Sequence, residues 1–152
     1  MIVVKAEESI RRRIDSILAE VKLRGFDTVV FLNEVIGQNP ANFIYVSGCW
    51  GYGEEHSALI FDLDGRSTVV MPHWGAPGME EKDLYDHVIP VKQEKGHHIM
   101  GIKEALERHH DAKRVCFDLS TISAQFAFQL MNALSIVLSK ELDISDHVFK
   151  LR

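Results

Sequence analysis

Apolar residues recur at helical spacing near the start of the chain and then gather into short continuous runs. Within residues 6–24 the periodic apolar positions are Ile10, Ile14, Ile17, Leu18 and Val21. This spacing places them on one face of a predicted helix, and Gly25 supplies its C-terminal stop. The run 26–32, FDTVVFL, predicts a buried strand, and residues 33–40 predict a loop that contains Gly37, Asn39 and Pro40.

A predicted β-hairpin over residues 57–71 follows in the middle of the chain. Its two apolar runs are joined at Asp64-Gly65, a pair of residue types that tolerates the positive φ of tight turns. The preceding residues are an aromatic-rich stretch, 42–47, and a loop punctuated by glycines, 48–56. A loop held on a rigid hairpin is a common way to present a contact surface, so residues 42–72 are the candidate functional region.

Predicted helices and strands alternate in the second half of the chain. A second loop between Pro72 and Pro77 contains His73 and Trp74. Residues 87–91 predict a short strand that Pro90 confines to a sheet edge or shortens. The other predicted elements are a short helix over 79–85, a helix over 97–110, a buried strand over 114–117, a helix capped by Ser120 or Thr121, an extended segment over 136–142 and a last helix capped by Ser145. This alternation predicts a mixed sheet with helices on its faces.

Composition and charge narrow the class of protein. The chain has 152 residues, 46% of them hydrophobic, which is enough for one globular domain with its own core. A formal charge of −5 argues against a nucleic-acid partner, which would require a basic face. We expect no membrane segment, because no apolar run approaches spanning length and the opening MIVV is too short for a signal-peptide core. Cys49 and Cys116 form neither a metal spacing nor a disulfide framework, so a cytoplasmic protein without a bond between them is expected.

Eight histidines invite a test for a metal site. They are His56, His73, His87, His97, His98, His109, His110 and His147. No two of them have the i, i+4 spacing of a helical metal pair, and His109 and His110 suit the C-terminal end of their helix as cations. We therefore expect no metal and no other cofactor in this chain.

Two other motifs in the region 48–56 resemble catalytic or cofactor-binding sequences but do not match them. Gly51-Tyr52-Gly53 begins like a dinucleotide fingerprint, but His56 takes the third glycine position and a hairpin follows instead of a helix. Cys49 is close in sequence to Glu55 and His56 and could be drawn as a nucleophile with its base. Such dyads usually join residues that are distant in sequence, and an oxyanion site is also needed. The chain alone is therefore not expected to be catalytic.

The loop over residues 48–56 leaves two interpretations open. Trp50 and Tyr52 either cap the hydrophobic core while Glu55 and His56 are solvated, or the loop contacts a ligand or a partner. Aromatic residues and a histidine in a glycine-rich loop suit contact, but composition alone does not decide between the two.

Several motifs follow one another in a characteristic order. GFD at 25–27 matches a G-[FL]-D turn into an apolar strand, and NFIYVSG at 42–48 matches N-x-x-Y-[LV]-[ST]-G. The hairpin ends in a proline, and RVCFD at 114–118 loosely matches a strand end of the form I-G-x-[DE], with a cysteine in place of the glycine. Residues 142–152 match L-x-D-x-S-x-x-[IV]-x-x-[LM]-R. In this order, the motifs resemble the N-terminal domain shared by creatinase, prolidase (Xaa-Pro dipeptidase) and aminopeptidase P.

The resemblance implies an α/β fold with a mixed, about six-stranded sheet and helices on both faces, in a single domain over residues 1–152. Relatives hold two divalent metal ions, such as Mn, Co or Zn, on carboxylate and histidine ligands in a second, pita-bread domain. That catalytic domain is expected to be absent from this chain, which would be either an excised N-terminal domain or a natural stand-alone version.

The resemblance also implies a site. In family dimers the loop after the S-G motif reaches the neighbouring subunit's active site and narrows it around a small substrate. The corresponding positions here lie among Trp50, Tyr52, Glu55 and His56, which we predict to form a substrate pocket in trans. Creatinase-like relatives place an arginine roughly where His56 stands. A neutral imidazole cannot replace a guanidinium fork, which leaves carboxylate recognition in question.

The function implied is that of a non-catalytic N-terminal domain of a Xaa-Pro dipeptidase- or aminopeptidase P-like metallohydrolase. Its parent would be a homodimer acting on a small peptide or small amide. The alternative is a free-standing binding or oligomerisation domain without an attached hydrolase, and a self-sufficient small enzyme is a third possibility. Pita-bread sequence beyond residue 152 of the parent reading frame would separate the first two.

Overall fold

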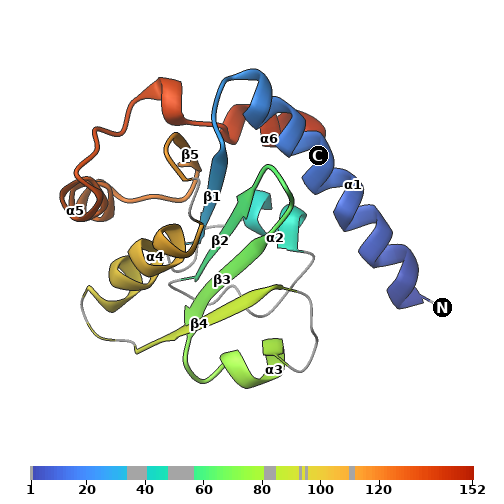
Figure 1. The fold of residues 1–152 in the computed structure, drawn as a ribbon, viewed down its shortest axis with the longest axis horizontal. Coiled ribbons are helices and arrows are strands. Elements are labelled where there is room, and N and C mark those ends of the chain that lie inside the picture. Colours follow the sequence, from blue (N-terminus) through green and yellow to red (C-terminus); the bar gives the residue numbers. More distant parts are fainter. Residues whose placement is uncertain are drawn as a thin grey trace.

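The computed structural model describes residues 2–33, 41–47, 57–80, 85–92, 94, 96–109 and 112–152, without the side chains of residues 2–7, 41 and 79 (Figure 1). Its elements in chain order are α1 (Ile2–Leu23), β1 (Thr28–Asn33), α2 (Ala41–Ser47), β2 (Ser57–Asp62), β3 (Ser67–Pro72), α3 (Ala76–Glu80), β4 (His87–Val91), α4 (His97–Arg108), β5 (Val115–Asp118), α5 (Ala124–Leu134), the 3₁₀ helix η1 (Lys140–Leu142) and α6 (Ser145–Leu151). None of the described helices is long and apolar enough to cross a bilayer.

The strands form one mixed sheet in the order β4-β3-β2-β1-β5. β2 pairs antiparallel with β1 and β3, while β4 and β5 add parallel to the two sides. The predicted α/β fold with a mixed sheet is therefore confirmed, with five strands among the described residues where about six were expected. The predicted edge strand is also confirmed, because β4 is an outer strand and Pro90 removes one backbone donor there.

Helices cover both faces of this sheet, as predicted (Figure 1). Val29 and Phe31 of β1 point to the face covered by α1, α2 and α6, where Ile17 and Val21 of α1 are buried. Val30 and Leu32 point to the opposite face, where α4 and α5 pack. Because both faces are covered, β1, β2 and β3 are buried along their whole length. This is the physical reason for their continuous apolar runs.

The hairpin is confirmed, with a longer connection than the simplest turn. The Asp62 N–H donates to Arg66 O at 3.1 Å and the Gly65 N–H to Asp62 O at 3.0 Å. Of the two predicted turn residues, only Gly65 has a positive φ, 80°. The connection is thus a three-residue loop whose last residue is left-handed, and a two-residue turn is excluded.

Several predicted helix boundaries are wrong. α3 begins at Ala76, before the predicted 79–85. α5 is capped by Ser123, whose hydroxyl accepts the Phe126 N–H at 3.1 Å. The predicted caps are engaged elsewhere: Thr121 Oγ1 donates to Leu32 O at 2.7 Å, and Ser120 Oγ accepts from Asn42 Nδ2 at 3.5 Å. Local sequence offers three hydroxyl residues within four positions, 120–123, and tertiary partners of the first two leave Ser123 as the cap.

The C-terminal segment also differs from the prediction. The extended segment predicted over residues 136–142 is wrong at its end, because residues 140–142 form η1. α6 follows Ile144, and Ser145 is its first residue rather than its cap. Asp143 supplies the capping oxygen, since its Oδ1 accepts the Ser145 N–H at 2.9 Å. At the other end of the chain, β1 begins at Thr28 because the Phe26 N–H still bonds Val21 O in the turn that ends α1.

Candidate functional site

The predicted pocket residues Trp50, Tyr52, Glu55 and His56 lie outside the described residues, as does Cys49. The structure describes the two elements between which they are placed in sequence. α2 ends at Ser47 and β2 begins at Ser57, and both serines are buried. β2 lies in the centre of the sheet, so the attachment at Ser57 is firm. The attachment at Ser47 depends on the contacts that fix α2.

Asn42, near the start of α2, ties this helix to two other segments. Its side chain is 4% exposed, and its Nδ2 donates to Asp118 Oδ1 of β5 and to Ser145 O of α6, each at 3.3 Å. Asn42 and Asp118 both belong to the sequence motifs described above. The tertiary structure therefore brings two separate motifs into one hydrogen-bonded group.

Asp143 completes this group from the segment before α6. Its Oδ1 accepts the N–H of Leu119 at 3.2 Å and that of Ser145 at 2.9 Å. Asp118 Oδ1 accepts the Ser120 N–H at 3.1 Å. We define the Asn42–Asp118 cluster as Asn42, Asp118, Ser120, Asp143 and Ser145. The cluster joins α2, the carboxyl end of β5 and the start of α6.

The Asp118 carboxyl is the electrostatically unusual member of the cluster. Burial raises its pKa above the ordinary value, and hydrogen bonds from Ser120 and Asn42 offset only part of this effect. Its Oδ2 is buried and has no hydrogen-bond partner among the described residues, and the same holds for Asn42 Oδ1. The hydrogen bonds of this cluster hold three segments together: α2, the carboxyl end of β5 and the start of α6.

The outer side of α2 is fixed by a second set of contacts. The Tyr45 hydroxyl donates to Leu151 O of α6 at 2.8 Å. The Arg13 guanidinium of α1 donates to Tyr45 O at 3.1 Å and lies 4.6 Å from the centre of the Tyr45 ring. α2 is thus attached to α1, β5 and α6, and the chain leaves it at Ser47 from a rigid base.

A second buried polar group was missed in the sequence. His109, at the end of α4, has an exposed fraction of 5%, and its ring lies between Asp62 and Thr68. Its Nδ1 is 3.2 Å from Asp62 Oδ2, and its Nε2 is 3.0 Å from Thr68 Oγ1. The ring is therefore a buried group at the helix end with polar partners on both sides. Sequence offered no signal for it, because its partners are 41 and 47 positions away.

The order Thr68–His109–Asp62 matches the hydrogen-bond chain of a nucleophilic triad. Thr68, however, is fully buried in the sheet. A substrate carbonyl could not approach its hydroxyl. The group instead attaches the end of α4 to the β2–β3 hairpin.

Cys116 is poorly placed to act as a nucleophile. Cys116 is a free, buried thiol whose Sγ lies 3.5 Å from Thr28 O, and burial raises its pKa to about 12. It is therefore a poor source of thiolate. Among the residues that the structure describes, no group of three or more His, Cys, Asp or Glu side chains is placed to hold a metal ion.

A family model and solved structures match this chain, whereas no curated protein matches it significantly. The family model "Creatinase/Prolidase N-terminal domain" matches residues 13–152.

Solved structures show the same fold at low sequence identity. Xaa-Pro dipeptidase from Bacillus anthracis is similar with a TM-score of 0.70 and 12% identity, over 94% of this chain and 36% of that chain. The N-terminal domain of Xaa-Pro dipeptidase from Lactobacillus brevis has a TM-score of 0.66 and 16% identity, over 90% of this chain and 97% of that chain. A proline dipeptidase from Streptococcus pneumoniae has a TM-score of 0.67 and 17% identity, over 90% of this chain and 94% of that chain. The chain thus spans about a third of the length of the Bacillus anthracis structure, 36%.

Proposed function

Because this chain belongs to the Creatinase/Prolidase N-terminal domain family, we propose that it is the non-catalytic N-terminal domain of a Xaa-Pro dipeptidase- or aminopeptidase P-like metallohydrolase. The family match over residues 13–152 carries this proposal. The two divalent metal ions and the hydrolytic residues would belong to a pita-bread domain of the parent protein.

The contribution of this domain would be a loop presented in trans within a homodimer. Trp50 and Tyr52 would supply apolar walls to the partner subunit's pocket, and His56 or Glu55 would contact a charged end of a small peptide or amide. The anchoring of α2 and the central position of β2 support this role, because binding groups act best from rigid elements.

The decisive experiment uses the full-length parent. His56→Ala is expected to lower kcat/KM for a Xaa-Pro dipeptide roughly 10- to 100-fold, the scale of one lost charge-assisted hydrogen bond. Its melting temperature should stay unchanged. His87→Ala is the matched control, since this histidine is exposed on the edge strand β4 and both quantities should be unaffected.

Two further measurements separate this role from its alternatives. The 152-residue chain alone should hydrolyse no Xaa-Pro dipeptide with Mn²⁺, Co²⁺ or Zn²⁺. Trp50→Ala in the parent should change kinetics more than stability. A loss of roughly 3–5 kcal/mol with unchanged kinetics would instead identify Trp50 as a core lid. A reading frame without pita-bread sequence would favour the free-standing binding or oligomerisation domain.

A further inference from the structure

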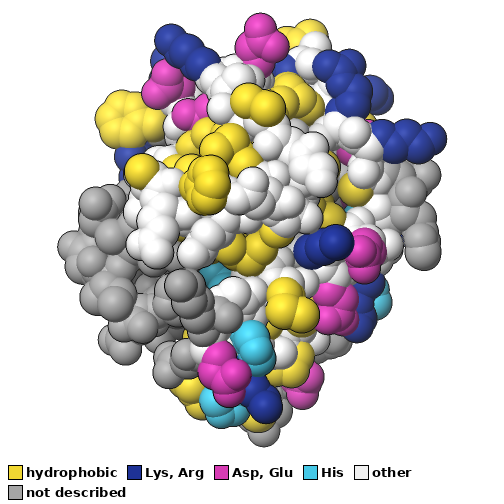
Figure 2. All heavy atoms as spheres, turned by 90° about the vertical axis from the view of Figure 1, so that its left-hand side faces the viewer, with side chains coloured by type: hydrophobic (Ala, Val, Ile, Leu, Met, Phe, Trp, Pro, Cys, Tyr) yellow, Lys and Arg dark blue, Asp and Glu magenta, His cyan; other side chains and the backbone are white. Residues whose placement is uncertain are grey.

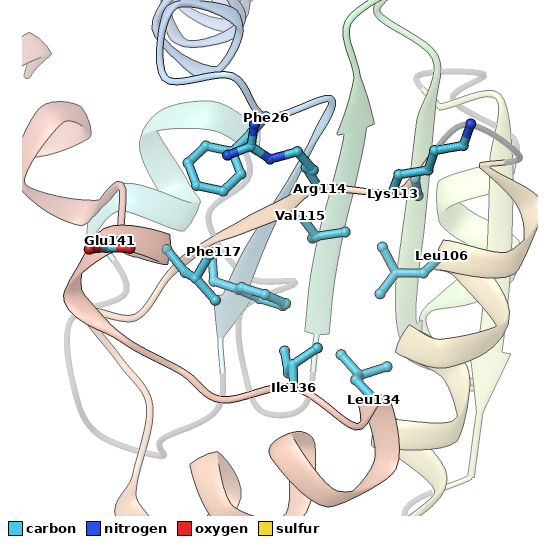
Figure 3. Close-up of a pocket in the computed structure, with 11 residues that line it drawn as sticks. Phe26, Leu106, Lys113, Arg114, Val115, Phe117, Leu134, Ile136 and Glu141 are labelled. Carbon is cyan, nitrogen blue, oxygen red and sulfur yellow. The ribbon is translucent and has the colours of Figure 1, made fainter.

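A cavity of about 470 Å³ opens beside the edge strand β5 (Figure 3). It lies between β5, the end of α4 and the segment from the end of α5 to η1. Its apolar lining consists of Phe26, Leu106, Ala112, Val115, Phe117, Leu134, Ile136 and Leu142. Its charged lining residues are Lys113, Arg114 and Glu141. The volume falls within the range of small-molecule sites, roughly 300–1,000 Å³.

The apolar walls are incompletely buried. Leu106, Val115, Leu134, Ile136 and Leu142 pack against the core of this face yet remain half-buried. On the side of the molecule that carries α5, hydrophobic side chains gather in a patch among polar ones (Figure 2). Covering such surface within a concavity is favourable because apolar area leaves water. The walls therefore favour an apolar group inside the cavity.

Arg114 lines the cavity, and its side chain is exposed. Its guanidinium lies 5.5 Å from the centre of the Phe26 ring, and its backbone N–H donates to Asp27 Oδ2 at 2.9 Å. Gly25 leaves the room that this arrangement needs: a Cβ there would be 3.0 Å from the Arg114 Nη1. None of the guanidinium N–H groups donates a hydrogen bond to another described residue. A planar donor fork beside the Phe26 ring is thus available for a carboxylate.

The charge around the mouth favours a single negative charge on the ligand. Lys113 and Arg114 are cationic and Glu141 is anionic, and all three side chains are exposed. In Figure 3 the Lys113 ammonium points away from the apolar side chains, whereas Arg114 extends across Phe26. Arg114 would therefore make the direct contact. Glu141 disfavours a second negative charge, so dicarboxylates and phosphates fit less well.

We propose that this cavity binds a small apolar monocarboxylate. Its hydrocarbon part lies against Val115, Leu134 and Ile136, and its carboxylate pairs with the Arg114 guanidinium. This site shares no residue with the loop over residues 48–56 and is independent of the pocket proposed in trans.

Two matched probes test this site on the 152-residue chain: 3-phenylpropanoate and its neutral amide, 3-phenylpropanamide. Calorimetry should show the carboxylate binding roughly tenfold more tightly than the amide, the scale of one charge-assisted contact. In ¹H–¹⁵N NMR spectra, the resonances that shift should be those of residues lining the cavity.

Three variants make the test specific. Arg114→Gln should remove the preference for the carboxylate while the amide still binds. Arg11→Gln, which changes an exposed arginine on α1, should leave both affinities unchanged. Ile136→Trp fills the cavity from a half-buried position and should abolish binding of both probes. The proposal is overturned by equal affinities for acid and amide, by a preference that survives Arg114→Gln, or by no binding of either probe at millimolar concentration.

Discussion

Asn42 Nδ2 donates a hydrogen bond of 3.3 Å to Asp118 Oδ1 across 76 positions of sequence. This contact joins the start of α2 to the carboxyl end of β5. The two remaining oxygens, Asn42 Oδ1 and Asp118 Oδ2, are buried without a hydrogen-bond partner among the described residues. An ionised Asp118 thus has one buried oxygen with hydrogen bonds and one without, and this lowers the stability of the folded state.

Asp118→Asn is expected to stabilise the fold at neutral pH. Burial raises the pKa of Asp118 above its unfolded value of 3.8, so ionisation is harder in the folded state. The contribution of Asp118 to the free energy of unfolding is favourable below the unfolded pKa and is lost as pH rises through the folded pKa. Asparagine keeps an acceptor oxygen without a buried charge. The free energy of unfolding should rise by about 1 kcal/mol at pH 7 and change little at about pH 3, as measured by urea titration.

Asp86 provides the control of opposite sign. A hydrogen bond from the Ser67 N–H, at 2.7 Å, lowers the pKa of Asp86. Its contribution is therefore present above the unfolded pKa and is lost as pH falls through the folded pKa. Asp86→Asn should destabilise at neutral pH and have little effect in acid. If Asp118→Asn also destabilised the protein at neutral pH and had little effect in acid, the ionised Asp118 carboxylate would be stabilising, and the prediction for Asp118 would be wrong.

His109→Ala should be strongly destabilising although no sequence motif includes this residue. The change removes the ring that contacts both Asp62 and Thr68 and leaves their buried polar atoms less well satisfied. We expect a loss of about 2–4 kcal/mol in denaturant titrations. His87→Ala, on the exposed edge strand, should change stability by less than about 0.5 kcal/mol. Equal losses of stability in the two variants would contradict the view that His109 attaches the end of α4 to the β2–β3 hairpin.

Gly101→Ala tests how closely α4 approaches the sheet. A Cβ at this position would lie 2.6 Å from Val91 Cγ1 and 2.7 Å from Val70 Cγ1. Overpacking of this kind costs about 1–3 kcal/mol, more than the gain of up to about 1 kcal/mol in helix propensity. The variant should melt at a lower temperature than the parent chain. Met100→Ala, at the neighbouring exposed position, is the control, and an increase in stability for Gly101→Ala would show that α4 can move away.

Cys116 should resist alkylation in the folded protein. Its thiol is buried, and burial raises its pKa to about 12, so little thiolate is accessible. In a Cys49→Ser background, iodoacetamide should modify it at least roughly 100-fold more slowly before denaturation than after. Asn132→Cys in the same background places a thiol on the exposed side of α5 as a reactive control. Rapid labelling of Cys116 under native conditions would contradict the burial of β5.

Parts of the fold could be predicted because they depend on neighbours in sequence. The apolar face of α1 and the continuous runs of β1 and β2 follow from residue spacing, as does the turn at Gly65. The cap of α5 could not be predicted, because Ser120, Thr121 and Ser123 are all competent. The hydrogen bond from Thr121 to Leu32 O, which helps to select Ser123, spans 89 positions.

The candidate site divides in the same way. The sequence by itself determined the family, the class of fold and the motif positions of Asn42 and Asp118, because these depend on residue types at fixed spacing. Only the tertiary structure decided that Asn42 bonds Asp118, that His109 lies between Asp62 and Thr68, and that Arg114 stands at the mouth of an apolar cavity. Such contacts join segments far apart in the chain, and packing rather than local preference sets their geometry.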